Sequence, residues 1–390
     1  MQEERGRTPV PLHSRITTQG LDRTPHRAFM RGMGLSDEDI AKPFIGIAST
    51  FGETTPCVGN LDIQAADAHE GVSAAGGTPR SFTTISVSDG VSMNHQGMKC
   101  SLMSRELIAD SVELVMRGHA YDGLVAFGGC DKNLPAMMMA MVRLNVPSIF
   151  IYGGSILPGR YKGRDIVVQD LFEAVGLHSV GKMDDVTLDE MERVACPSAG
   201  SCGGQYTANT MAMVAEAIGL ALPYSCGAPA PYEIRDAFCS NAGEQVMELL
   251  KQNLRPRDIV TRKSIENAVA LIMATGGSTN AVLHYLAIAD AAEVEWTLDD
   301  FERVRRTVPV LCDLKPSGRF MAVDPPKPGR TPPLPQLLLT ARPLHADRLP
   351  LTRPPIDPPP SHAPPHPRAP PQAPRTPHPP PHTHDPPPLL

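Results

Sequence analysis

The 390-residue sequence lacks the features of membrane-spanning and secreted proteins. No run approaches the roughly 18 consecutive apolar residues from which a transmembrane helix is inferred. The first residues, MQEERGRTPVPLHSR, contain no apolar segment of a secretory signal. Basic residues are not in excess, because 36 Lys and Arg stand against 42 Asp and Glu, a net charge of −6. A nucleic-acid or membrane-surface partner would favour a basic face, so we expect a cytoplasmic protein with neither kind of partner.

The paired cysteine spacing of a zinc site is also absent, because no two cysteines form a CxxC pair. A sequence without a secretory signal is not expected to join its cysteines in disulfides. Each of the eight is therefore either a buried small side chain or a metal or redox ligand. They are Cys57, Cys100, Cys130, Cys196, Cys202, Cys226, Cys239 and Cys312.

The last 66 residues lack Glu, Asn, Cys, Met and every aromatic residue, and they hold 26 of the 42 prolines. Such a composition cannot bury enough apolar surface to fold. We therefore divide the chain into an α/β domain at 1–324 and a disordered Pro/Arg/His-rich tail at 325–390. Two origins of the tail stay open: a natural Pro-rich linker or SH3-type ligand, and out-of-frame translation of a GC-rich gene. The abruptness of the change after Asp324 favours the second.

Short apolar segments alternate with helical patterns over the first 150 residues, which is typical of a parallel α/β sheet flanked by helices. The pattern predicts strands at Phe44–Ser49, Phe82–Val87, Leu124–Gly128 and Ser148–Tyr152, and helices near Leu61–Ala75, Ser101–Arg117 and Pro135–Leu144. The following block is mainly helical, with helices predicted at 167–175, 187–195, 205–221, 241–253, 263–274, 278–292 and 298–306, and a strand at Val308–Leu311. In such sheets, ligands bind at the carboxyl ends of the strands.

Three cysteines stand in loops rich in Gly and Pro: Cys57 in GETTPCVGN, Cys130 in FGGCDKNLP and Cys202 in CPSAGSCGGQYTANT. Glycine allows a bulky group to approach the backbone, and a thiol at a strand end or helix N-terminus is expected to have a lowered pKa. Singly, each is more simply a buried structural thiol. Together they favour a ligand set. An iron–sulfur cluster with three protein ligands would leave one iron free as a Lewis acid.

Two carboxylates and a lysine stand near these loops. Asp131 and Lys132 follow Cys130 directly, and Asp89 lies in ISVSDGVSM, which we expect at the carboxyl end of a strand. Each is compatible with a solvated turn residue, and SDG with an Asx-turn. The alternative is a site for Mg²⁺, which prefers carboxylate oxygens. Lys132 would join it only after carbamylation, which turns the amine into an oxygen donor.

The stretch ATGGSTNAVLHYL contains the remaining candidates, Ser278, Thr279 and Asn280. Ser278 or Thr279 is a plausible helix N-cap, and the free backbone N–H groups beyond it would suit a substrate carboxylate or phosphate. A simple helix start is an equally good interpretation. The methionines of Met137–Met141 are interpreted as core residues.

Taken together, these motifs resemble the dihydroxy-acid and 6-phosphogluconate dehydratase family. The resemblance runs from about residue 16 to 324 and rests on these stretches: GIAST…ETTPC, SVSDGVSMNHQGMKCSLMSRELIADSVE, DGLVAFGGCDKNLPAMMMA, VPSIFIYGGSILPGR, VQDLFEAVG, ERVACPSAGSCGGQYTANTMA, ATGGSTNAVLHYLAIA and PVLCDLKPSGRF.

The resemblance implies a [2Fe–2S] or [4Fe–4S] cluster on Cys57, Cys130 and Cys202, and Mg²⁺ on Asp89, Asp131 and carbamylated Lys132. It also implies a homodimer. The implied reaction removes water from a 2,3-dihydroxy-3-methyl carboxylic acid to give a 2-oxo acid of branched-chain amino-acid biosynthesis. A 6-phosphogluconate or sugar-acid dehydratase of the same fold stays open. So does a non-catalytic iron–sulfur-binding fragment whose Pro-rich tail recruits partners.

Two departures from the family pattern stand out. Val58 follows Cys57 where the family usually has Asn. In the family, a β-rich C-terminal domain follows the LKPSGRF region and supplies a further carboxylate ligand and the serine base. The residues from Pro325 onward do not resemble that domain. We therefore expect this domain, and with it the family's base serine, to be missing. The catalytic base stays unassigned, and we expect this chain to have little or no activity.

Overall fold

The computed structural model describes residues 11–321. The predicted tail at 325–390 lies outside this range, so its predicted disorder stays a prediction. The described chain forms helices α1 (Arg15–Thr18), α2 (Thr24–Gly32), α3 (Asp37–Ala41), α4 (Leu61–Ala74), α5 (Asp89–Ser92), α6 (Lys99–Gly118), α7 (Asn133–Leu144), α8 (Val168–Ser179), α9 (Asp185–Glu192), α10 (Thr207–Ile218), α11 (Glu233–Gln252), α12 (Pro256–Ile259), α13 (Arg262–Thr275), α14 (Asn280–Ala291) and α15 (Leu298–Arg305). None of these helices is long and apolar enough to cross a membrane.

The strands build a four-stranded parallel sheet in the order β2-β1-β3-β4, as predicted for an α/β fold. They are β1 (Phe44–Ser49), β2 (Thr78–Thr83), β3 (Gly123–Gly128) and β4 (Ser148–Tyr152). Every residue of β1, β3 and β4 is buried, because helices cover both faces of the sheet. Burial on both faces requires every residue of these strands to be apolar or small, which is why they appear as unbroken apolar runs in the sequence.

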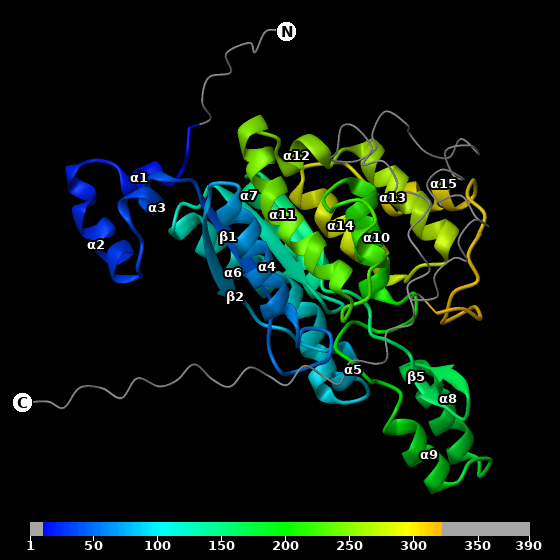
Figure 1. Cartoon of the computed structure of the whole chain (residues 1–390). Coiled ribbons are helices and arrows are strands. Elements are labelled where there is room, and N and C mark those ends of the chain that lie inside the picture. The colour runs from blue at the N-terminus through cyan, green and yellow to red at the C-terminus, as the bar shows by residue number, and fades with distance from the viewer. Residues whose placement is uncertain (1–10, 322–390) are drawn as a thin grey trace, which may run out of the picture. The chain divides into compact units, whose positions relative to one another are not determined.

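Alternate residues of each strand enter different cores. Ile45, Ile47 and Val125 pack with α4 and α11 on one face, and Figure 1 shows these two helices side by side. Ala48 and Leu124 join a larger core on the other face with the methionines of α7 and residues of α6, α10, α13 and α14. Met137–Met141 is therefore core, as predicted. Both cores leave the carboxyl edge of the sheet to the loops that carry the candidate site.

Two strand predictions were wrong, one in position and one in type. The second strand spans Thr78–Thr83 rather than Phe82–Val87, because its residues pair in register with β1, from Phe44 opposite Thr78 to Ser49 opposite Thr83. Val308–Leu311 is not a strand. Instead, the backbone N–H groups of Leu311 and Cys312 donate to Ala274 O near the end of α13. In both cases the hydrogen-bond partners offered by the neighbouring backbone outweighed the local β propensity.

The helical block agrees in element type but not in every boundary. Helix α11 starts at Glu233, several residues before the predicted 241. A hairpin of β5 (Gly159–Tyr161) and β6 (Arg164–Ile166) and the helices α1 to α3 were not predicted. The hairpin packs with α8 and α9 around a small separate core that includes Tyr161, Ile166 and Met191.

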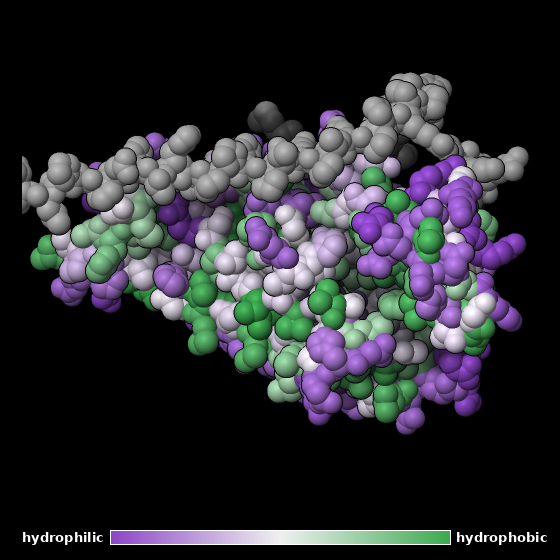
Figure 2. Space-filling model, turned by 90° about the horizontal axis from the view of Figure 1, so that it is seen from below, coloured by the Kyte–Doolittle hydropathy of each residue, from purple (hydrophilic) through white to green (hydrophobic). Residues whose placement is uncertain are grey.

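Helices α5 and α6 also carry exposed apolar side chains. Val91, Met103 and Leu107 of α5 and α6 are 66%, 63% and 57% exposed. Figure 2 shows apolar residues gathered on the face seen from below, between more polar areas.

Candidate active site

The candidate residues come from loops at the carboxyl edge of the sheet. Cys57 lies in the loop after β1, and Cys130, Asp131 and Lys132 lie between β3 and α7. Cys202 lies in the loop before α10. Since the strands are parallel, their carboxyl ends share one edge. Asp89 is different from the prediction, because it is the first residue of α5 and lies beyond the end of β2, where the Ser88 hydroxyl accepts from the Val91 N–H.

Backbone contacts hold the three cysteine loops together. Gly200 N donates to Pro56 O at 2.8 Å, and the Ser201 hydroxyl donates to Gly129 O. The first bond joins the Cys202 loop to the residue before Cys57, and the second joins it to the residue before Cys130. A Cβ atom on Gly129 would lie 1.9 Å from Cys57 O, so only glycine allows this approach. The fold therefore brings together thiols that are 73 and 72 residues apart in the chain.

Cys57 and Cys130 are buried and Cys202 is half-buried, and the pKa values of two of the three thiols differ from the prediction. A hydrogen bond with the Cys130 thiol, together with burial, raises the pKa of Cys57, whereas the same bond lowers the pKa of Cys130. Burial raises the pKa of Cys202 to about 12, and the nearby Asp131 adds to the effect. The predicted lowering holds for Cys130 alone. Without a metal, Cys57 and Cys202 are protonated thiols, so ligation would have to release their protons.

Lys132 lies between the two candidate carboxylates. Its Nζ atom is 2.6 Å from Asp89 Oδ2 and 3.8 Å from Asp131 Oδ2. Its side chain is 6% exposed, against 14% for Asp89 and 19% for Asp131. The Ser101 hydroxyl donates to Asp89 Oδ1 at 2.7 Å. Sequence reasoning had not identified Ser101, which is adjacent only because α6 begins beside α5.

Although Asp131 precedes α7 in the chain, its carboxylate lies in space beside the first residues of α10. Its carboxylate accepts from the Thr207 hydroxyl and the Ala208 backbone N–H, which are the first residues of that helix. Burial raises the pKa of Asp131, and the positive charge of Lys132 opposes that rise. The helix dipole favours a negative charge at this position. Thr207 was another residue that the sequence analysis did not single out.

The stretch at 278–280 joins the same network through Thr207. Its hydroxyl lies 3.1 Å from Ser278 Oγ and accepts from Asn280 Nδ2 at 3.0 Å. The backbone N–H of Ser278 donates to Thr210 Oγ1, and that of Asn280 to Ser278 Oγ. Thr279 occupies the N-cap position of α14 but makes no side-chain cap. These side chains thus connect to Asp131, while the two amides already have partners within the protein.

The donor atoms at the sheet edge suit the implied metals by their chemistry but not by their present arrangement. Within residues 11–321, no set of three or more His, Cys, Asp or Glu side chains is arranged as a metal site. The chemistry of the donors nevertheless fits. Two carboxylates suit a hard cation if the Lys132 amine is converted to an anionic carbamate. Three thiols in interlocked loops, two of them buried, suit an iron–sulfur cluster. An orphaned polar group supports the latter, because the buried Asn133 Nδ2 has no hydrogen-bond partner while its Oδ1 accepts from Cys130 N.

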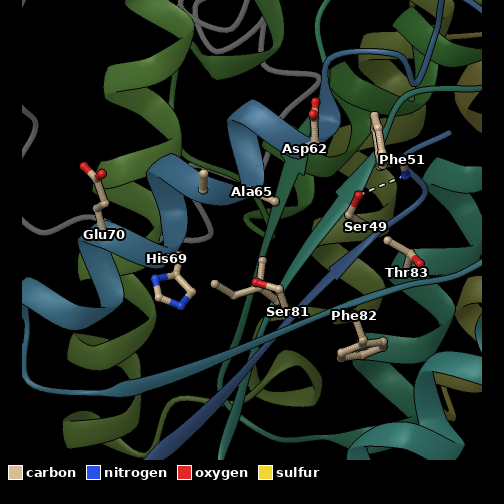
Figure 3. Close-up of a pocket in the computed structure, with 11 residues that line it drawn as sticks. Ser49, Phe51, Asp62, Ala65, His69, Glu70, Ser81, Phe82 and Thr83 are labelled. Atoms are coloured by element: carbon tan, nitrogen blue, oxygen red, sulfur yellow. Dashed lines mark hydrogen bonds between the residues drawn. The ribbon is translucent and has the colours of Figure 1, made fainter. Parts of the chain in front are cut away.

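A cavity of about 550 Å³ lies elsewhere, between α4 and the sheet edge at β2. Figure 3 shows Asp62, His69 and Glu70 of α4 on one side, and Ser81 and Thr83 of β2 on the other. None of the candidate thiols or carboxylates lines it. The chemistry predicted from the sequence is therefore not located in this cavity.

A parallel α/β sheet with thiols, carboxylates and a lysine gathered at its carboxyl edge is the architecture of an enzyme domain that binds ligands at that edge. The family model for the dihydroxy-acid/6-phosphogluconate dehydratase N-terminal region matches residues 42–357. The chain belongs to this family. The match continues past Asp324, where the composition changes, and the domain boundary proposed there stays a prediction.

Named relatives are similar over most of the chain. It is 60% identical over 341 residues to "Dihydroxy-acid dehydratase 2" of Bradyrhizobium diazoefficiens, a match that covers 87% of this chain and 59% of that protein. The same coverage of this chain holds for "Dihydroxy-acid dehydratase 2" of Mesorhizobium japonicum at 60% identity, and for "Dihydroxy-acid dehydratase" of Pelagibacter ubique at 57%. The chain spans 58% and 60% of those two proteins.

Proposed function

We propose that this chain carries the metal-binding part of a hydro-lyase that converts 2,3-dihydroxy-3-methyl carboxylic acids to 2-oxo acids in branched-chain amino-acid biosynthesis. The observation that carries the proposal is the convergence of three loop thiols with an Asp–Lys–Asp group at one sheet edge. The names of the relatives favour dihydroxy acids over 6-phosphogluconate or other sugar acids. We further propose a cytoplasmic homodimer, for which the exposed apolar residues of α5 and α6 offer a surface.

The proposed ligands are Cys57, Cys130 and Cys202 for an iron–sulfur cluster, and Asp89, Asp131 and carbamylated Lys132 for Mg²⁺. When bound, the cluster would supply a Lewis acid for the leaving 3-hydroxyl, and Mg²⁺ one for the carboxylate and 2-hydroxyl. Ser101 and Thr207 orient the two carboxylates. The Lys132 side chain is 6% exposed, which limits the access of water to its nitrogen. The base that removes the C2 proton is not assigned to any described residue.

Lys132 would become a ligand by reacting with CO₂. The Lys132 ammonium first loses a proton to water. The resulting neutral amine attacks the carbon of CO₂, an N–C bond forms, one C=O electron pair moves to oxygen, and a second proton leaves the nitrogen for water. The product is a carbamate anion. The carbamate is repelled by the two carboxylates that attracted the ammonium, so a cation shared by the three groups would stabilise the site.

The test begins with anaerobic purification, visible absorption, and iron and sulfide analysis. We expect cluster absorption in the wild-type chain and its loss in Cys57→Ser, Cys130→Ser and Cys202→Ser, with Cys100→Ser, an exposed thiol, as the matched control. Cluster absorption that survives in all three variants would refute the ligand assignment.

Substrate choice is tested separately, by supplying 2,3-dihydroxy-3-methylbutanoate, 6-phosphogluconate and an unphosphorylated sugar acid to the loaded chain. Turnover of 6-phosphogluconate alone would replace the proposed substrate class. Cluster binding without turnover of any of them would favour the non-catalytic alternative and agree with the expected inactivity. Turnover at rates typical of enzymes, of about 10 per second, would refute that expectation.

A further inference from the structure

His284 of α14 is fully buried, and its Nε2 atom has no hydrogen-bond partner. Its Nδ1 atom lies 3.2 Å from Arg105 Nη1. A guanidinium can only donate, so Nδ1 is the acceptor and the ring proton must be on Nε2. Arg105 thus fixes the tautomer and turns His284 into a buried N–H donor that lacks an acceptor. Such a donor is disfavoured in a folded protein unless an acceptor binds there.

Helical spacing places this donor beside the proposed magnesium ligands. Arg105 lies one turn after Ser101 on α6, and Ser101 donates to Asp89. His284 lies one turn after Asn280 on α14, and Asn280 donates to Thr207, which in turn donates to Asp131. Residues four apart share a helix face. The Arg105–His284 contact therefore joins the two helices next to the Asp89–Lys132–Asp131 group.

Electrostatics agree with this placement. Burial lowers the pKa of His284 to about 3, and the positive charges of Lys132 and Arg105 contribute to the effect. The imidazole is therefore neutral at pH 7, and Lys132 is close enough to influence it. In its ammonium form Lys132 has only donors and offers His284 no acceptor. A carbamate on the same nitrogen carries two oxygen acceptors.

We propose that Arg105 and His284 are a positioning pair that presents the Nε2–H group of His284 to a carboxylate-like anion at Lys132, namely the carbamate formed from its amine and CO₂. This inference rests on the proposed function, because carbamylated Lys132 is part of it. The carboxylate of a bound 2-hydroxy acid has the same acceptor chemistry. The test distinguishes the two sources.

The experiment uses the full chain with MgCl₂ and ¹³C-labelled bicarbonate, and follows the carbamate carbon by NMR. Lys132→Met identifies the signal. His284→Leu removes the donor, and His284→Gln retains an N–H group in its place. Tyr285→Phe is the matched control, because Tyr285 is the next residue, is equally buried and also has an unpartnered polar atom. Circular dichroism verifies that each variant is folded. Binding of glycolate, a simple 2-hydroxy acid, is measured in parallel by calorimetry.

We expect His284→Leu to raise the bicarbonate concentration for half-maximal labelling by about tenfold or more, because a hydrogen bond to an anion is lost. His284→Gln and Tyr285→Phe should remain within about twofold of the wild-type chain. Weakened glycolate binding with unchanged labelling in His284→Leu would assign the donor to a ligand carboxylate and overturn the carbamate assignment.

Three results would overturn the positioning role. In the first, folded His284→Leu is unchanged in both assays. In the second, His284→Gln loses as much as His284→Leu, which would indicate packing alone. In the third, the wild-type chain gives no carbamate signal at any bicarbonate concentration, which would remove Lys132 from the proposed metal site, whereas the first two results leave that site intact.

Discussion

The buried ion pair between Lys132 and Asp89 makes the sharpest prediction for stability. The two side chains are 6% and 14% exposed and their charged atoms are 2.6 Å apart. Removing one partner of a buried pair leaves the other charge uncompensated, which destabilises a protein by about 3 kcal/mol or more. Lys132→Met should reach that value, because it leaves Asp89 beside a second carboxylate, Asp131.

Asp89→Asn should have a smaller effect, about 1–2 kcal/mol, because Lys132 retains Asp131 at 3.8 Å and the Ser101 hydroxyl still has an oxygen acceptor. The double variant should be more stable than the sum of the two losses predicts, with a coupling energy of about 2 kcal/mol.

The assay is urea denaturation at pH 7 in buffer free of CO₂ and Mg²⁺, with the unfolding free energy extrapolated linearly to water. Adding bicarbonate and MgCl₂ should stabilise the wild-type chain and leave Lys132→Met unchanged, since a ligand bound only to the folded state adds to its stability. A loss below about 1 kcal/mol for Lys132→Met, or strict additivity in the double variant, would refute the reasoning.

Three further predictions concern the loops, the imidazole and the N-terminal segment. Gly129→Ala should destabilise the chain by about 3 kcal/mol and abolish cluster absorption, because its Cβ would lie 1.9 Å from Cys57 O, whereas the Cβ of Gly59→Ala, in the loop that carries Cys57, meets nothing closer than 4.0 Å. Equal urea midpoints for the two would contradict this packing. The pKa of His284 is lowered from 6.5 to about 3 in the folded chain, so the unfolded state binds the proton more readily and the wild type should lose stability as the pH falls from 6.5 towards 3. His284→Gln lacks that loss, and parallel stability curves for the two between pH 7 and pH 4 would sink the prediction. Asp122→Ala should cost about 3 kcal/mol, because the buried carboxylate accepts from Ser14 N and Phe44 N. Limited proteolysis should then cut first near residue 14, and an unchanged cleavage pattern would argue against this anchor.

How far the sequence determined the fold depends on the kind of burial. The strands at Phe44–Ser49 and Ser148–Tyr152 were predicted with their observed bounds, because helices on both faces require unbroken apolar residues that any reader of the sequence can see. Strand β2 was placed wrongly, since only its first two residues are buried and its limits follow from the register with β1. Local residue preference does not contain that register.

The same division applies to the candidate site. The sequence by itself determined the family, the loops rich in glycine and the residue types that suit thiolate and oxygen ligands. Only the tertiary structure decided that Gly200 meets Pro56, that Thr207 links Asn280 to Asp131, and that Arg105 fixes the tautomer of His284 across 179 residues of chain. These contacts join segments that are distant in sequence, and their hydrogen bonds depend on how helices and loops pack around the sheet edge. A linear pattern records which side chains will be buried, but it does not record which buried groups will become neighbours.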